Sequence, residues 1–109
     1  MPLQYSSKNN PRVLVIQKLY GKFINNDEIL IFKKHRFKKF IKDIVNGTIE
    51  RNDIIEEEIS NHLKSDLSLN KIDKVFQVII KCAIFEFLYK PKTSTKIIIN
   101  EYLKASNFF

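Results

Sequence analysis

Apolar residues recur every three to four positions in several segments of the chain, and this spacing predicts a helical protein. In the first such segment the apolar positions are Val13, Ile16, Leu19, Tyr20 and Phe23. Asn10 followed by Pro11 is a typical helix start, because asparagine caps free amides and proline needs no amide partner in the first turn. We therefore expect a helix over residues 11–23, preceded by a polar tail over residues 1–10.

The strongest pattern lies between residues 72 and 88. Helical spacing continues there for about four turns, through Ile72, Val75, Phe76, Ile79, Ile80, Ala83, Ile84, Phe87 and Leu88. Lys90 precedes Pro91, and the residue before a proline avoids helical angles. The pattern predicts a long central helix that ends near Lys90 and turns this apolar stripe toward the core.

The remaining segments predict shorter helices. Residues 28–45 suggest one or two helices ending near Gly47, although the apolar run over residues 29–32 has no clear period. Asp53 and Glu56 have the spacing of a capping box, which predicts a helix start with Ile55, Ile59 and Leu63 facing the core. Asn70 and Asp73 mark the start of the central helix.

Ser94 is the expected cap of a last helix. Its inward residues would be Ile98, Ile99, Tyr102 and Leu103. A short strand over residues 97–99 is an alternative, but no second strand is available to pair with it. With only two glycines and three prolines in 109 residues, the chain is expected to be one all-α domain of about five to six helices over residues 11–109.

Charge is distributed unevenly along the chain. Residues 1–47 hold 10 basic and 3 acidic side chains, whereas residues 48–109 hold 9 of each, so the net charge of +7 comes from the first part. Six cations lie within ten residues without an intervening acid: Lys33, Lys34, Arg36, Lys38, Lys39 and Lys42. Such a run is often only a solvated helix face, but this one lacks acidic partners inside it. We therefore expect it to bind a polyanion.

Arg12 is a second candidate, because a cation in the first turn of a helix opposes the helix dipole. Something outside the helix is expected to compensate its charge. Together with Lys8, Arg12 could contact phosphate. A harmless exposed arginine is the alternative.

Catalytic and metal sites find little support. His35 and His62 lie far apart and lack neighbours at metal-ligand spacing. Cys82 falls among core positions, where a packed thiol is expected rather than a nucleophile. We expect no catalytic residues, no metal and no cofactor, and hence no enzyme. A single cysteine, no signal peptide and no apolar run of about 20 residues favour a cytoplasmic protein without a membrane partner.

Five motifs in order make the chain similar to the NusB family of transcription antitermination factors. The first helix carries Arg12, Gln17, Leu19 and Tyr20 at the spacing of the NusB opening helix, and the segment from Phe40 to Gly47 resembles a Phe-x-x-x-Leu-Val-x-Gly motif. Two pieces, residues 69–75 and residues 80–87, resemble the central helix. Residues 96–102 resemble the Lys-Val-x-Ile-Asn-Glu-Ala motif. The similarity covers residues 12–109.

This resemblance implies a bundle of two small helical subdomains. It also implies binding to single-stranded boxA-like RNA of ribosomal RNA leaders, jointly with NusE, a ribosomal protein, in the RNA polymerase antitermination complex. By position, Arg12 would belong to the RNA surface, and Tyr20 and Glu86 to the surface that meets NusE. Lys81 and Phe85 replace the usual arginine and tyrosine of the family.

From the resemblance, we expect the last helix that is usual in the family to be missing here. We therefore expect an exposed apolar patch at positions such as Ile84, Ile98 or Tyr102, with possible self-association. Two other functions remain open. One is a basic helical adaptor that binds an acidic protein. The other is a fragment related to the helical domain of RNA methyltransferases.

Overall fold

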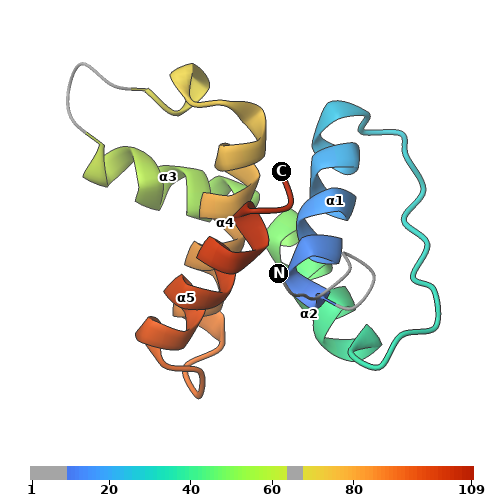
Figure 1. Cartoon of the computed structure of the whole chain (residues 1–109). Coiled ribbons are helices and arrows are strands. Elements are labelled where there is room, and N and C mark those ends of the chain that lie inside the picture. Colours follow the sequence, from blue (N-terminus) through green and yellow to red (C-terminus); the bar gives the residue numbers. More distant parts are fainter. Residues whose placement is uncertain (1–9, 64–67) are drawn as a thin grey trace.

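In the computed structural model, residues 10–63 and 68–109 are described. These residues form five α-helices and one short 3-10 helix, η1 (Leu69–Lys71), as Figure 1 shows. The α-helices are α1 (Pro11–Ile24), α2 (Lys38–Glu50), α3 (Asn52–His62), α4 (Lys74–Tyr89) and α5 (Thr95–Ser106). The all-α prediction is confirmed. The alternative strand over residues 97–99 is wrong, because these residues lie within α5.

Helix α4 is the centre of the fold. It contacts α1, α2, α3 and α5, and Figure 1 shows α1 and α2 on one side of it and α3 and α5 on the other. The buried side chains of all five helices form one core cluster, which includes Ile16 of α1, Ile44 of α2, Ile55 of α3, Val78 of α4 and Ile98 of α5. The two groups of helices are therefore held together by a shared apolar interior.

Two predicted helix starts are confirmed by their caps. The Asn10 side chain accepts hydrogen bonds from the amides of Arg12 (3.0 Å) and Val13 (3.3 Å), and Ser94 Oγ accepts one from Ile97 (3.3 Å). The capping box at Asp53 is wrong, because α3 begins earlier, at Asn52, and Arg51 before it makes no side-chain cap. Glu56 instead accepts a hydrogen bond from Lys81 of α4 (2.7 Å).

Helix α2 ends close to the predicted position near Gly47, and Gly47 itself lies inside the helix. The helix continues to Glu50, and the backbone of Gly47 is buried against Phe85 of α4. A Cβ atom at Gly47 would lie only 2.2 Å from Phe85 Cζ. The glycine is therefore explained by the close approach of α2 and α4 and not by a turn.

The central helix has the predicted length but buries another face. Its start at Lys74 and its end before Lys90 match the sequence patterns. The buried residues of α4 are Gln77, Val78, Lys81, Cys82, Phe85 and Glu86, whereas the predicted stripe is only partly buried or exposed. Phe76 and Leu88 of that stripe are exposed. The prediction failed because Lys81 and Glu86 are buried through ion pairs with Glu56 and Arg12.

Helix α5 also differs in part from the expectation. Ile98 and Tyr102 are buried in the core as inward-facing residues, so they do not form an exposed patch. The exposed apolar residues of this region are instead Ile97, Ile99, Leu103, Phe108 and Phe109. Self-association through these residues stays a prediction.

The connection between α1 and α2, residues 25–37, contains no helix or strand. Its residues 29–32 alternate, with Leu30 and Phe32 packed against the core and Ile29 and Ile31 exposed, which is the period of an extended chain. Two lysines of α1 donate hydrogen bonds to three carbonyl groups of this connection. Lys18 donates to the carbonyl of Ile31, and Lys22 donates to those of Asn26 and Glu28. These bonds attach the extended connection to α1.

Candidate nucleic-acid interface

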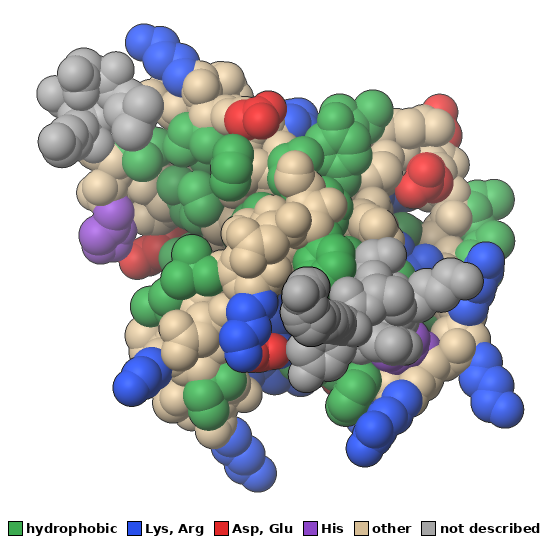
Figure 2. All heavy atoms as spheres, in the orientation of Figure 1, with side chains coloured by type: hydrophobic (Ala, Val, Ile, Leu, Met, Phe, Trp, Pro, Cys, Tyr) green, Lys and Arg blue, Asp and Glu red, His purple; other side chains and the backbone are tan. Residues whose placement is uncertain are grey.

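The basic run lies where the connection enters α2. Lys33, Lys34 and Arg36 belong to the end of the connection, and Lys38, Lys39 and Lys42 belong to the first turns of α2. All six side chains are exposed. Figure 2 shows Lys and Arg side chains projecting from the lower right of the molecule, where Figure 1 places the end of the connection and the start of α2. The fold thus keeps the predicted cations on one stretch of surface.

A groove of about 430 Å³ runs beneath three of these lysines. Lys33, Lys34 and Lys38 line it together with Lys18 of α1, whose ammonium lies 5.2 Å from the centre of the Phe32 ring. Its apolar wall is formed by Leu14, Phe32 and Ile41. Lysine stems can lie along such a wall while their charged ends stay in water. Several ammonium groups at one groove suit the successive phosphates of an extended nucleic-acid strand.

Among the described residues, one cation of the run, Lys39, forms an ion pair, and its partner is Asp43. Its carboxylate lies 3.1 Å from the Lys39 ammonium and 3.5 Å from that of Lys90. The hydrogen bond from Lys39 holds the pKa of Asp43 below its ordinary value. One acid beside six cations leaves a strong positive excess at this surface. Asp43 directly follows the run, and it gives Lys39 an acidic partner at i,i+4 spacing, which no residue inside the run provides.

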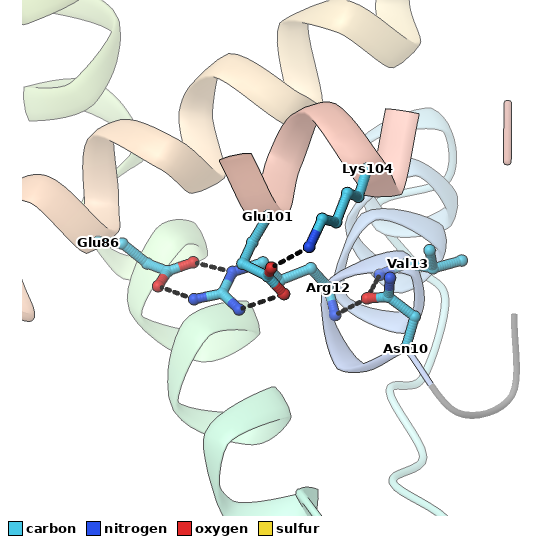
Figure 3. Close-up of polar contacts among 6 residues, drawn as sticks. All are labelled: Asn10, Arg12, Val13, Glu86, Glu101 and Lys104. Carbon is cyan, nitrogen blue, oxygen red and sulfur yellow. Dashed lines mark hydrogen bonds and ion pairs between the residues drawn. The ribbon is translucent and has the colours of Figure 1, made fainter. Parts of the chain in front are cut away.

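Arg12 is buried, which corrects the expectation that it contacts RNA from an exposed position. Its guanidinium donates two hydrogen bonds to Glu86, from Nε (3.0 Å) and Nη2 (2.7 Å), and its Nη1 lies 3.8 Å from Glu101. Figure 3 shows the side chain reaching from α1 to Glu86 on α4, with Glu101 of α5 beside it. Its side chain is only 10% exposed. The expected compensation of its charge therefore comes from within the protein.

Electrostatics explain why this charge can stay inside the protein. Burial disfavours the charged guanidinium, but the hydrogen bonds to Glu86 outweigh that cost, and the pKa of Arg12 is raised above its ordinary value. The guanidinium carbon also lies 4.9 Å from the centre of the Phe40 ring and 5.4 Å from that of Tyr102. Arg12 thus joins α1, α2, α4 and α5 at one point. Lys8, its expected companion, lies outside the described residues.

Glu86 does not face a partner, contrary to the expectation for this residue. It is 0% exposed and is held by Arg12, so its charge is used inside the fold. Tyr20 of α1 is 37% exposed and can be reached from outside. The thiol of Cys82 is buried as expected for a packed side chain, and burial raises its pKa.

Sequence reasoning missed three residues that lie near the basic run. Phe37 and Phe40 line a cavity next to Arg36, and Lys104 of α5 lines it from the other end of the chain. The signal for Phe37 was its position inside the basic run, because aromatic residues between cations are frequent in proteins that bind single strands. Nothing in the sequence pattern placed Lys104 beside residues 36–40.

The fold and the site describe an all-α protein with an exposed basic segment where the connection from α1 enters α2. Among the described residues, no helix is long and apolar enough to cross a membrane, and no group of three or more potential ligands could hold a metal ion. The NusB family model matches residues 9–109. The chain belongs to the NusB family.

Curated relatives agree with this assignment. The chain is 33% identical to the transcription antitermination protein NusB of Rickettsia bellii over 107 residues, which cover 95% of this chain and 69% of the relative. It is 27% identical to NusB of Oceanobacillus iheyensis, over 94% of this chain and 85% of the relative. It is 30% identical to NusB of Limosilactobacillus reuteri, over 86% of this chain and 64% of the relative. No solved structure matches the chain significantly.

Proposed function

We propose that this member of the NusB family is a non-enzymatic RNA-binding factor that acts in transcription antitermination in the cytoplasm. Its RNA is single-stranded and boxA-like, from ribosomal RNA leaders, and it binds together with NusE in the antitermination complex of RNA polymerase. The observation that carries the proposal is the exposed run of six cations around residues 33–42, with Asp43 as its acidic neighbour. Family membership supports the role in antitermination.

Phosphate contact predicts a steep salt dependence. RNA binding releases counterions, so the logarithm of the affinity should fall with the logarithm of salt by a slope of about −0.7 per phosphate contact on a single strand. Changing Lys33, Lys34 and Lys38 to glutamate removes three exposed cations of the groove. We expect the slope to become shallower by about 2 and the affinity to fall at every salt concentration. Fluorescence anisotropy with labelled boxA-like RNA measures both quantities.

A matched variant controls for net charge. Lys71, Lys92 and Lys96 are exposed lysines outside the run, and changing them to glutamate alters the charge by the same amount. This control should keep a nearly wild-type slope. Equal losses in both variants, or wild-type affinity that barely changes with salt, would contradict the proposed interface. Scrambled RNA and duplex DNA in parallel titrations test sequence and strand preference.

The NusE surface is proposed to include Tyr20, the exposed member of the pair expected there. Tyr20→Ala should weaken NusE binding by about tenfold or more, because a large aromatic at an interface often anchors the partner. Binding of RNA alone should be unaffected. Tyr89→Ala is the control, since Tyr89 of α4 has the same exposed fraction, 37%. Identical NusE titrations for wild type and Tyr20→Ala would remove Tyr20 from the interface.

A further inference from the structure

A cavity of about 690 Å³ lies between the start of α1, the end of the 25–37 connection and α5. This volume is within the range of small-molecule sites, which is about 300–1,000 Å³. Its lining includes two aromatic side chains, Phe37 and Phe40, and three cations, Arg12, Arg36 and Lys104. The cavity adjoins the basic run, because Arg36 and Phe37 belong to both.

Phe37 presents an exposed aromatic ring at this cavity. Its side chain is 41% exposed, and the residue directly precedes α2. The Arg36 guanidinium carbon lies 5.4 Å from the centre of its ring, and the His35 ring lies 6.0 Å away at a tilt of 43°. The Phe37 amide donates a hydrogen bond to His35 Nδ1 (2.9 Å), which fixes the two residues relative to each other.

An aromatic ring held among cations is the arrangement that proteins use to stack an unpaired base. Every base has a flat face, and base–aromatic stacking combines with electrostatic attraction of the backbone. Arg36 can serve in both ways, since a guanidinium both stacks on bases and binds phosphate. The ring of Phe40, already engaged by Arg12 on α1, provides a second apolar wall in the same cavity.

The charges of the cavity favour a base inside it and phosphate outside. The charge of Arg12 is satisfied by Glu86, and the Glu101 carboxylate lies 3.8 Å from Arg12 Nη1, where it would repel a phosphate. A carboxylate can instead accept hydrogen bonds from base amino or imino groups. Lys104 lies on the same helix as Glu101 and forms an ion pair with it (3.4 Å), which Figure 3 shows as a dashed line. The Lys104 side chain is 66% exposed, so its ammonium can also turn outward to a phosphate.

We infer that this cavity takes one unpaired nucleobase, stacked on Phe37, from the RNA that the basic run holds by its backbone. Arg36 and Lys104 then contact the phosphates on either side of that base. The inference rests on the proposed RNA binding and adds to it a site that selects single strands. A base in a duplex cannot enter without first being unpaired and unstacked, which costs free energy.

The test compares three variants on single-stranded and duplex RNA of the same sequence. Phe37→Leu keeps an apolar side chain but removes the aromatic face, and Phe37→Tyr keeps that face. Phe76→Leu is the matched control, since Phe76 is an exposed phenylalanine on α4 outside the cavity. Titrations use the full chain and single strands with 2-aminopurine at successive positions, whose fluorescence is quenched by stacking.

We expect Phe37→Leu to weaken single-strand binding by about 5- to 150-fold, the range for stacking of one base on an aromatic ring. It should leave duplex binding and the salt slope unchanged and abolish the quenching at one position. Phe37→Tyr and Phe76→Leu should bind like wild type. Because Phe37 is exposed, a melting curve is expected to show an intact fold.

Three results would overturn the inference. Wild-type single-strand affinity in Phe37→Leu, with the salt-dependent binding intact, rejects the base site and leaves the proposed function standing. Equal losses on single strands and duplexes show that Phe37 only shapes the start of α2. A wild-type protein that binds no RNA at low salt, or that binds an acidic peptide in preference, rejects the proposed function and the base site together.

Discussion

Replacing Glu86 by alanine is expected to lower the free energy of unfolding by about 3–5 kcal/mol, because it leaves a buried guanidinium without its partner. Glu86 is 0% exposed and accepts two hydrogen bonds from Arg12. Without Glu86, the Arg12 guanidinium keeps its charge in a place that is only 10% exposed to water. Urea denaturation followed by circular dichroism measures the change, and a loss of this size would consume much of the stability of a small domain.

Two further variants show whether the effect comes from the pair. Glu101→Ala removes a carboxylate that is 36% exposed and 3.8 Å from Arg12, so it should cost less than about 1 kcal/mol. Replacing both members, as Arg12→Met with Glu86→Leu, should be less harmful than Glu86→Ala alone, because no charge is then left unpaired. If Glu86→Ala unfolds at the wild-type urea concentration, the pair does not stabilise the fold.

Gly47→Ala is expected to lower the free energy of unfolding by about 1–3 kcal/mol, the usual range for overpacking a core. The new Cβ would lie 2.2 and 2.4 Å from ring carbons of Phe85, which is itself buried between helices. Alanine in a helix interior normally gains up to about 1 kcal/mol over glycine, but the steric overlap with a packed ring outweighs this gain. Thermal melting of the variant checks the sign of the effect.

Gly21 provides the matched control for this prediction. The nearest atom to a Cβ there is a carboxylate oxygen of Glu28, at 2.6 Å, which lies at the end of an exposed side chain that can move away. Gly21→Ala should therefore be neutral or stabilising. Combining Gly47→Ala with Phe85→Leu should recover part of the loss. A Gly47→Ala protein that melts above wild type would show that α2 and α4 adjust without cost.

The sequence pattern located the helices more reliably than their buried faces. Helix α4 has the predicted ends, because proline and helical periodicity are local signals. Its buried face contains Lys81 and Glu86, although a hydrophobicity pattern predicts that charged residues lie on the exposed face. Their burial depends on partners 25 and 74 positions away, Glu56 and Arg12, and such distant pairing leaves no local signal. The packing role of Gly47 left no local signal for the same reason, since Phe85 lies on another helix.

The candidate site could be anticipated in its charge but not in its shape. A run of cations without an intervening acid stays exposed in almost any fold, so Lys33, Lys34 and Arg36 lie where charge alone predicts. The cavity beside them depends on three segments that meet only in the folded protein, carrying Arg12, Phe37 and Lys104. Arg12 stood out because its charge opposes the helix dipole, yet that signal does not say what compensates it.

The separation of Arg12 and Glu86 also has a consequence for the order of events during translation. The two residues are 74 positions apart, and the chain is made from its N-terminus at about 5–20 residues per second, so Glu86 follows Arg12 by about 4–15 s. Until α4 has left the ribosome, α1 carries a guanidinium that must stay hydrated and cannot pack into the interior. A nascent chain that stalls before α4 is made therefore lacks the buried ion pair that joins α1 to α4.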